Sequence, residues 1–436
     1  MLNAEFLLRM QEYLGADYQA FLDSYQAENI RGLRINANYM TEQKFAELSN
    51  FSTKKIANIP NAYVVGEEVK FGFHPLHHAG AFYLQDPSAM IPALSAHLQS
   101  NFKVLDLCAA PGGKSTQLAE ILKDGVLFAN EIDTKRAWSL YSNVERLGFK
   151  NVVVTNNCPK DYLQSFQGYF DAILVDAPCS GEGMFRKYPE SQALWSSDNI
   201  KVCAERDKEI LTIANKLLKK DGILIYSTCT FAKEENEEIV TFMQKELGYD
   251  SLKIKETLLP CVRKGFIENT YRIYPQDGFG EGQFVAVLKK QDDEKTNYKQ
   301  IKFSNTPKEF KEFCDKALIK SIDNLLVCKE DIFYCASNVA CNGLKVLNYG
   351  VKLGKIQNKR FIPEHHFFKA FYQEFINQVN LSFKDSLVTK YLHGEQINYE
   401  AKNGFGVLLV DGIPLGGFKA SNNNLNNHYP KGLRNY

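Results

Sequence analysis

Three absences narrow what this sequence can encode. Its ten cysteines are scattered over 436 residues and form no Cys-x-x-Cys pair, which predicts a reducing compartment and excludes a disulfide scaffold and a zinc ribbon. No apolar run approaches the roughly 18 residues that cross a bilayer. The first six residues contain no basic segment followed by an apolar stretch, so no signal peptide is expected. We therefore expect a cytoplasmic protein that does not enter a membrane.

The sequence also has almost no net charge. Lys and Arg total 52 against 51 Asp and Glu, a balance of +1, so the overall charge indicates no nucleic-acid partner. The distribution is uneven, because residues 1–290 carry 32 basic and 36 acidic side chains whereas the last 96 residues carry 12 and 6. A local excess of positive charge attracts phosphate regardless of base sequence, so this end of the chain is predicted to bind RNA.

Composition and length predict several folded domains. Hydrophobic residues make up 44% of the chain and charged residues 24%, which excludes a disordered or collagen-like protein. A chain of 436 residues is about three times the length of a single domain, so two to four domains are expected. We predict four regions, with boundaries that give 1–95, 96–290, 291–362 and 363–436.

The region 96–290 has the rhythm of an α/β fold. Short apolar runs alternate with longer polar helical stretches, which predicts a parallel, doubly wound sheet with helices on both faces. The predicted strands are residues 103–107, 126–129, 152–154, 172–175 and 222–226. Residues 283–288 are predicted to form a last strand at the edge of this sheet.

The flanking regions have weaker patterns. Residues 1–95 are predicted to form helices and turns. The polar stretch 289–306, which has no apolar periodicity, is predicted to be a linker. Beyond it we expect a helix over 363–379 and a strand over 406–410, followed by the turn pair Asp411-Gly412.

A loop that could hold a ligand follows the first predicted strand. Residues 106–116 read Asp-Leu-Cys-Ala-Ala-Pro-Gly-Gly-Lys-Ser-Thr, and small residues at a helix start let backbone N–H groups approach a bound molecule. The ending is that of a phosphate-binding loop, but that motif needs glycine where this chain has Cys108, so a nucleoside-triphosphate site is excluded. Glu131 lies 18 residues beyond Gly113, where a doubly wound fold presents an acid to ribose hydroxyls. A tight turn and a surface acid are the alternative interpretation.

Two cysteines lie at the ends of predicted strands. Cys179 belongs to Asp176-Ala177-Pro178-Cys179-Ser180-Gly181, and Cys229 belongs to Ser227-Thr228-Cys229-Thr230. Because the carboxyl ends of parallel strands meet at one edge of a sheet, both thiols could face one cleft. A buried, inert thiol is the ordinary interpretation of a single cysteine, but it is less favoured for two at matching positions.

The ordered motifs 108–114, 176–181 and 227–230 resemble those of the Nol1/Nop2/Sun family of RNA cytosine-carbon-5 methyltransferases. Residues 182–187 and 427–434 resemble the bacterial RsmF (YebU-like) branch, which acts on 16S ribosomal RNA. The resemblance covers essentially the whole chain. It implies a Rossmann-like class I methyltransferase sheet dependent on S-adenosylmethionine, an N-terminal RNA-binding region and a C-terminal α+β PUA-like module.

Site residues follow from the resemblance. It implies that Cys229 is the nucleophile, that Cys179 assists release of the product, and that Asp176 lies near the methionine or target-base end of the site. One position departs from the family, because Cys158 stands where many members have an acid near the adenine; Asn157 or a backbone amide could replace that contact. The implied cofactor-binding residues are Cys108, Ala109, Ala110, Pro111, Gly112, Gly113, Lys114, Glu131, Arg136, Cys158 and Asp176.

Cytosine chemistry explains why two thiols and an acid would be needed. Carbon 5 is too weak a nucleophile to accept a methyl group, but a thiolate added to carbon 6 turns the ring into an enamine-like nucleophile. Cys229 must therefore be deprotonated when the base is bound. Asp176 would stabilise the adduct, and Cys179 would remove the proton of carbon 5, directly or through water.

Two other groups of residues have competing interpretations. His74, His77 and His78 could suggest a metal, but no Cys or carboxylate pattern completes a site, so a structural loop is favoured. A basic and aromatic segment suits RNA phosphates and bases, although a solvated basic face over a core aromatic cluster fits it about equally well. Its residues are Lys352, Lys355, Lys359, Arg360, Phe361, Phe367, Phe368 and Tyr372. The positive charge of the last 96 residues favours the RNA interpretation.

We therefore expect a monomeric enzyme that binds S-adenosylmethionine and no metal and makes 5-methylcytosine in 16S ribosomal RNA. Transfer RNA is the alternative substrate. DNA is disfavoured, because the DNA enzymes place their nucleophile in the Pro-Cys turn. A non-catalytic RNA-binding assembly factor is the other alternative, but pure binding needs neither thiol.

Overall fold

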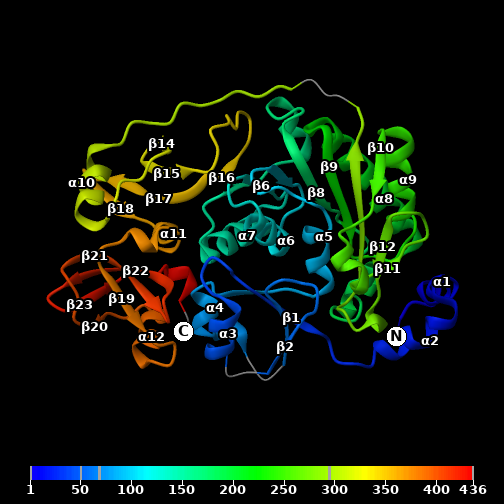
Figure 1. The fold of residues 1–436 in the computed structure, drawn as a ribbon, viewed down its shortest axis with the longest axis horizontal. Helices are drawn as coiled ribbons and strands as arrows, with labels where there is room; N and C mark the ends of the chain where they lie inside the picture. Colours follow the sequence, from blue (N-terminus) through cyan, green and yellow to red (C-terminus); the bar gives the residue numbers. More distant parts are fainter. Residues whose placement is uncertain (1, 50–51, 67–69, 293–295, 435–436) are drawn as a thin grey trace.

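A computed structural model describes residues 2–49, 52–66, 70–292 and 296–434. Within these ranges the strands form four sheets, a central one of ten strands flanked by smaller sheets (Figure 1). The central sheet runs β11-β12-β13-β9-β8-β5-β6-β7-β16, and β10 pairs with β13. No helix in the described part of the chain is long and apolar enough to cross a membrane.

All five predicted strands of the parallel sheet are confirmed. They are β5 (Lys103–Asp106), β6 (Val126–Asn130), β7 (Val152–Thr155), β8 (Phe170–Asp176) and β9 (Leu218–Thr228). β5 is flanked by β6 and β8, so the order of the strands reverses there and their carboxyl ends open a crevice. The strands are apolar almost throughout because helices cover both faces. These helices are α6 (Gly113–Ile121), α7 (Thr134–Leu147), α8 (Ser197–Leu217) and α9 (Glu237–Glu246).

Helix α7 shows how local sequence sets these helices. The side chain of Asp133 caps its first turn by accepting a hydrogen bond from the backbone of Arg136, and Gly148 ends it with a left-handed φ of 69°. Its buried residues recur at helical spacing, so one stripe faces the sheet. They are Ala137, Leu140, Val144 and Leu147.

The predicted edge position of residues 283–288 is wrong. They lie in β13 (Gln283–Lys290), which is antiparallel to both β9 and β12 (Thr270–Ile273) and is buried at nearly every residue. β11 (Arg263–Lys264) and β10 (Tyr249–Leu252) complete this end of the sheet. Arg272 obscured the strand signal of β12, because a buried arginine interrupts an otherwise apolar pattern.

The prediction of only helices and turns for residues 1–95 is wrong as well, because a four-stranded sheet forms there. It consists of β1 (Arg31–Ile35), β2 (Thr53–Lys55), β3 (Ala62–Val65) and β4 (Phe82–Leu84). The helices of this region are α1 (Ala4–Leu14), α2 (Tyr18–Ser24), α3 (Glu42–Leu48), α4 (Pro75–His78) and α5 (Ile91–Ser95). α1 and α2 lie beside β11 and β12, away from the rest of the N-terminal region (Figure 1).

The predicted linker lies between β13 and α10 (Lys308–Ala317). Its first two residues belong to β13, residues 293–295 lie outside the described ranges, and residues 296–306 form no helix or strand beyond isolated bridges. A small sheet follows, built from β14 (Leu325–Cys328), β15 (Asp331–Cys335), β17 (Gly350–Gln357) and β18 (Arg360–Pro363). β16 (Val346–Asn348), which lies between β15 and β17 in sequence, pairs with β7 instead. This strand therefore connects residues 308–363 to the central sheet.

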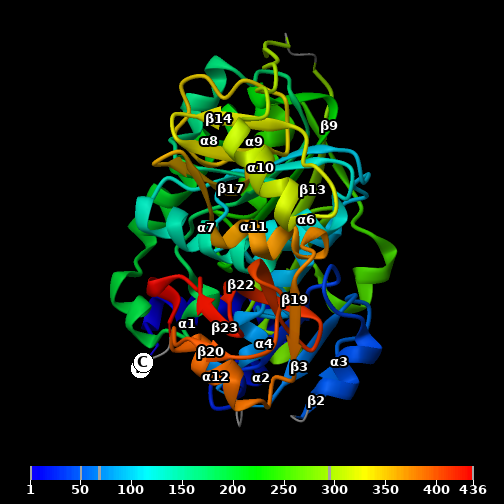
Figure 2. The same cartoon turned by 90° about the vertical axis from the view of Figure 1, so that its left-hand side faces the viewer.

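The last part of the chain is a five-stranded sheet with two helices. The strands are β19 (Gln378–Leu381), β20 (Ile397–Asn398), β21 (Gly404–Val410), β22 (Ile413–Ser421) and β23 (Asn424–Asn427). The helices are α11 (His365–Ala370), which lies between β17 and β22 (Figure 2), and α12 (Ser386–Leu392). The helix predicted over 363–379 is therefore too long. The predicted turn is confirmed, since Asp411 and Gly412 join β21 to β22 with φ of 49° and 81°.

The predicted aromatic surface for RNA is wrong for three of its members. Phe361, Phe367 and Phe368 are buried in one hydrophobic core with α10 and β17. Lys359 and Arg360, by contrast, are exposed at the turn between β17 and β18. The basic residues thus form a solvated face over aromatic core residues.

Candidate active site

The loop after β5 leads directly into helix α6 at the crevice of the sheet. Gly112 takes a left-handed φ of 113° at the start of α6, and the Ala110–Pro111 peptide is cis. Ser115 Oγ donates to Asp106 Oδ2 at 2.6 Å, and burial raises the pKa of Asp106 to about 7. Backbone groups of small residues therefore face the crevice.

A pocket lies against this loop, and the N-terminal region forms its other wall. Residues 108–111 and Gly113 line one side, with Asp106, Lys114 and Asp176. Tyr83, Leu84, Gln85, Asp86 and Ala89 line the other side. Sequence reasoning missed this second wall, because only the polar run Gln85-Asp86 hinted at it.

Buried Arg34 of β1 fixes the two walls to one another. Its guanidinium donates to the backbone oxygen of Gly113 at 3.2 Å and to Thr116 Oγ1 at 2.7 Å, and it pairs with Glu120 at 2.8 Å. The N-terminal sheet is therefore joined to the first turns of α6.

Glu131 and Arg136 lie beside the same loop. The Glu131 side chain is 3% exposed; it accepts from the backbone of Asp133 at 3.0 Å and pairs with Arg136 at 3.2 Å. Arg136 also donates to the backbone oxygen of Ala110 at 2.8 Å. A carboxylate has about four acceptor positions, so Glu131 keeps capacity for ribose hydroxyls. This capacity and the pocket lined by residues 108–111, Gly113 and Lys114 fit S-adenosylmethionine.

Gly112, Glu131 and Arg136 do not line the pocket, and neither does Cys158. Its backbone N–H donates to Asp161 Oδ2 at 3.0 Å at the start of a short 3-10 helix. Asn157 uses both groups of its side chain on the backbone of Lys345, at 2.8 and 3.1 Å. The role of position 158 stays a prediction, and the Asn157 side chain is already engaged.

Asp176 ends β8 and is held by three neighbours. Lys114 Nζ lies 2.8 Å from its Oδ2, while Ser227 Oγ and Gln283 Nε2 donate to Oδ1 at 2.7 and 3.3 Å. Gln283 comes from β13 and was missed by sequence reasoning, because only the fold places that strand beside β9. The carboxylate is fixed at the pocket with part of its surface accessible.

The thiols of Cys179 and Cys229 lie together, with Sγ atoms 3.4 Å apart. Both cysteines are free. The hydrogen bond with Cys229 and burial raise the pKa of Cys179 well above its ordinary value. At this distance either thiol can donate a hydrogen bond to the other sulfur.

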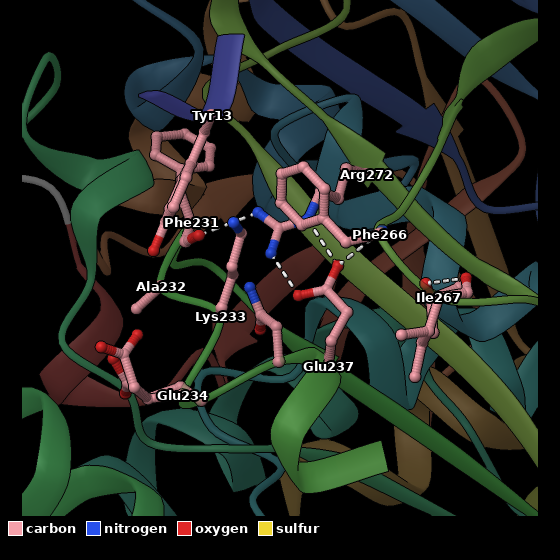
Figure 3. Close-up of polar contacts among 12 residues, drawn as sticks. Tyr13, Phe231, Ala232, Lys233, Glu234, Glu237, Phe266, Ile267 and Arg272 are labelled. Atoms are coloured by element: carbon pink, nitrogen blue, oxygen red, sulfur yellow. Dashed lines mark hydrogen bonds and ion pairs between the residues drawn. The ribbon is translucent and has the colours of Figure 1, made fainter. Parts of the chain in front are cut away.

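Residues 231–237, which follow Cys229, contact side chains from other parts of the chain (Figure 3). Arg272 donates to both oxygens of Glu237 and, at 2.8 Å, to the backbone oxygen of Phe231. Lys233 Nζ lies 4.3 Å from the ring centre of Tyr13 and 4.4 Å from that of Phe266. These contacts join α1 and β12 to the segment that carries Cys229.

The three histidines predicted to be structural lie near α4. His74 accepts from the backbone of Leu76 at 3.2 Å, and His78 Nδ1 lies 3.1 Å from the hydroxyl of Tyr429. Burial lowers the pKa of His77 to about 3. Across the described ranges, no group of three His, Cys, Asp or Glu side chains is arranged to hold a metal ion.

Comparison with known proteins places this site in a family. Family models described as "16S rRNA methyltransferase RsmB/F" and "N-terminal domain of 16S rRNA methyltransferase RsmF" match residues 93–289 and 2–87. Models described as "RsmF rRNA methyltransferase first C-terminal domain" and "Methyltransferase RsmF PUA domain" match residues 312–371 and 378–435.

Named relatives agree with these matches. The ribosomal RNA small subunit methyltransferase F of Pectobacterium atrosepticum is 30% identical over 398 residues, which span 84% of this chain and 81% of that protein. Its namesake from Serratia proteamaculans is 34% identical over 66% of this chain, and the match spans 63% of the relative's length.

Solved structures share the fold. A methyltransferase homologue from Pyrococcus horikoshii has a TM-score of 0.54 and 25% identity, over 65% of this chain and 93% of its own. NSun6 from Pyrococcus horikoshii with SFG has a TM-score of 0.59 and 19% identity, over 67% of this chain and 99% of its own. The chain belongs to the RsmF family of S-adenosylmethionine-dependent 16S ribosomal RNA methyltransferases.

Proposed function

We propose that this protein methylates carbon 5 of cytosine in 16S ribosomal RNA through a covalent bond between Cys229 Sγ and carbon 6. The observation that carries the proposal is the pair of thiols, 3.4 Å apart, at the ends of β8 and β9. They follow the strand ends at which Asp176 pairs with Ser227, and Asp176 also lines the pocket. Pure RNA binding requires neither thiol.

The loop 108–114 and Glu131 would hold the cofactor. Bound S-adenosylmethionine supplies the methyl group that carbon 5 accepts. Backbone N–H groups at the start of α6 and the wall from Tyr83 to Asp86 would orient it. Arg136 would keep the Glu131 carboxylate facing the loop.

The protein's own groups account for the remaining steps. Cys229 attacks carbon 6, and the Asp176 carboxylate accepts hydrogen bonds from the pyrimidine edge to stabilise the adduct. After methylation, Cys179 in its thiolate form accepts the proton of carbon 5, directly or through water, and becomes a thiol. The bond between Cys229 and carbon 6 then breaks, and the electron pair returns to sulfur as a thiolate.

Regions on either side of the catalytic region 96–290 would select the RNA. We propose that residues 1–95 and 363–436 bind RNA. Residues 291–362 would form the linker and first C-terminal domain between the catalytic region and residues 363–436. The charge excess of the last 96 residues supports this role. The protein would act as a cytoplasmic monomer.

Methyl transfer from labelled S-adenosylmethionine tests the proposal. The purified protein should label 16S ribosomal RNA or small-subunit particles, and digestion of the RNA should yield labelled 5-methylcytidine. Transfer RNA in a parallel reaction should remain unlabelled. Label confined to transfer RNA would replace the substrate, and label in another nucleoside would overturn the proposed chemistry.

A further inference from the structure

A polar network joins the two cysteine loops. Ser180, which follows Cys179, places its Oγ 2.8 Å from Oγ1 of Thr230, which follows Cys229. The backbone N–H of Gly183 also donates to the oxygen of Cys229 at 2.8 Å, and a Cβ on Gly183 would lie only 2.8 Å from that oxygen. The two loops thus approach closely through both side chains and backbone.

A carboxyl group closes each end of this network. Glu182 Oε2 accepts from Thr230 Oγ1 at 3.0 Å and from the backbone of Phe231 at 2.8 Å. Glu235 accepts from the backbone of Ser180 at 2.8 Å and from its hydroxyl at 2.5 Å. We call these four hydrogen-bonded side chains, Glu182, Thr230, Ser180 and Glu235, the carboxyl clasp.

Proton counting shows that the clasp is one proton short when both carboxyls are ionised. Three oxygen–oxygen contacts run along it, each needing one proton to be a hydrogen bond, but the two hydroxyls supply only two. Glu182, Thr230 and Glu235 are 1% exposed or less and only Ser180 is partly exposed, so water can reach the clasp at Ser180 alone. One additional proton on a carboxyl lets every contact form.

The surroundings favour that proton. Burial raises the pKa of Glu182, and burial together with the charge of Glu182 raises the pKa of Glu235 to about 7, although Ser180 opposes the shift. Other titratable or charged side chains that act on the clasp are Arg9, Tyr13, Tyr25, Cys179, Cys203, Arg206, Asp207 and Tyr226.

We propose that the carboxyl clasp holds one shared proton and thereby positions the thiols of Cys179 and Cys229 for catalysis. The proposal rests on the proposed function, because the spacing of the thiols matters only if Cys229 attacks the base. Glu182 and Glu235 are positioning residues in this scheme, since they act through the loops.

The two glutamates respond differently to substitution by glutamine. Both oxygens of Glu182 accept from N–H donors, Oε1 from the indole of Trp195 at 2.9 Å and Oε2 from Phe231. In Glu182→Gln the amide NH2 must therefore point at an N–H donor in either orientation of the side chain, at the Trp195 indole or at the Phe231 backbone. In Glu235→Gln the amide oxygen can accept from the Ser180 backbone, and the amide NH2 can donate to the Ser180 hydroxyl. The Ser180 hydroxyl can then donate to Thr230, so every contact of the clasp has a proton.

The experiment measures covalent trapping on 16S ribosomal RNA transcribed with 5-fluorocytidine, because fluorine at carbon 5 prevents elimination. At saturating RNA and S-adenosylmethionine and pH 7, Glu182→Gln should slow trapping at least tenfold, and Glu235→Gln no more than about threefold. Cofactor affinity should change less than twofold in both. Glu205→Gln, at an exposed carboxylate on α8, is the matched control.

A pH series separates positioning from general damage. The trapping rate of the wild-type protein divided by that of Glu235→Gln should fall several-fold from pH 7 to 9, because only the wild type loses the shared proton. Thr230→Val removes the hydroxyl in the middle of the clasp, so this variant should trap RNA slowly. Its trapping rate divided by that of Glu235→Gln should not fall between pH 7 and 9. It serves as the test if Glu182→Gln does not fold.

The outcomes distinguish two failures. Equal slowing by the two glutamine variants, or a flat pH ratio, would overturn the clasp. A wild-type protein that methylates no RNA and traps none would instead overturn the proposed function.

Discussion

Nζ of Lys114 lies 2.8 Å from Oδ2 of Asp176, which joins the first turn of α6 to the end of β8. An ion pair therefore links the loop proposed to bind the cofactor to Asp176, the acid proposed to contact the target base. Their side chains are 12% and 31% exposed, so the pair is only partly screened by water.

Lys114→Met should lower the free energy of unfolding by about 1 to 3 kcal/mol, because it leaves the Asp176 carboxylate without its cation in a half-buried site. Urea unfolding measures this loss. Lys201→Met removes an exposed partner of Asp198 and should cost less than about 0.5 kcal/mol. Equal losses in the two variants would show that the Lys114 pair has no special weight.

Glu131→Ala should weaken S-adenosylmethionine binding roughly ten- to a hundredfold, because charge-assisted hydrogen bonds to the ribose are lost. Affinity for RNA should change little. Calorimetry measures both, and Arg136→Ala, which leaves the carboxylate in place, should weaken cofactor binding less. An unchanged cofactor dissociation constant in Glu131→Ala would remove this residue from the site.

The parallel strands and the loops at their ends could be predicted because both depend on local sequence. A strand covered on two faces is an uninterrupted apolar run, and Cys179 and Cys229 follow two such runs. Since carboxyl ends of parallel strands share one edge, the fold class predicted that the two thiols could face one cleft, and the pairing of β8 with β9 brings them together.

The missed features depend on contacts between distant segments. β1 to β4 are three to five residues long, and β1 includes the buried polar residue Arg34, whose partners lie in α6. Glu235 and Gln283 carry no local signature, and the motif 182–187 assigns no role to Glu182, because each of the three becomes significant only where another loop or strand meets it. Phe367 and Phe368 look like a binding surface in sequence, since nothing local shows that β17 and β22 cover them.

Asp207 of α8 predicts an unusual pH dependence of stability. It is buried, one of its oxygens has no hydrogen-bond partner, and burial raises its pKa to about 8. A raised pKa means that the folded protein holds a proton which the unfolded chain releases near pH 4. The contribution of this group is therefore complete below about pH 4 and is lost as pH rises towards 8.

Asp207→Asn should remove that loss. The free energy of unfolding of the variant minus that of the wild type should increase by up to about 1.4 kcal/mol per pH unit between pH 6 and 8, then level off. Chemical unfolding across this range tests it, with exposed Asp198→Asn as the control. A difference that does not vary with pH would mean that Asp207 is ionised throughout.

The exposed pair Lys359 and Arg360 should contribute to RNA affinity through phosphate alone. Replacing both by Gln should reduce the slope of log affinity against log salt by roughly 1.4 to 1.8, if each neutralises one phosphate. Filter binding at several salt concentrations measures the slope. Lys201→Gln with Lys245→Gln removes the same charge from α8 and α9 and should leave the slope nearly unchanged.

The thiols of Cys179 and Cys229 can be separated by what each variant leaves behind. Cys229→Ala cannot bond to carbon 6, so it should bind RNA and cofactor yet give neither product nor adduct. Cys179→Ala still attacks and methylates, but elimination stalls because the proton of carbon 5 is not removed. It should accumulate protein joined to RNA, seen as a shifted band on a denaturing gel and only when S-adenosylmethionine is present.

Two other patterns would contradict these roles. If both thiols merely pack, each variant should lose modest stability and turn over at a near-normal rate. If the roles are reversed, the adduct should form in Cys229→Ala and disappear in Cys179→Ala. Because the Sγ atoms are only 3.4 Å apart, position alone favours neither thiol, so the band on the gel decides which one attacks.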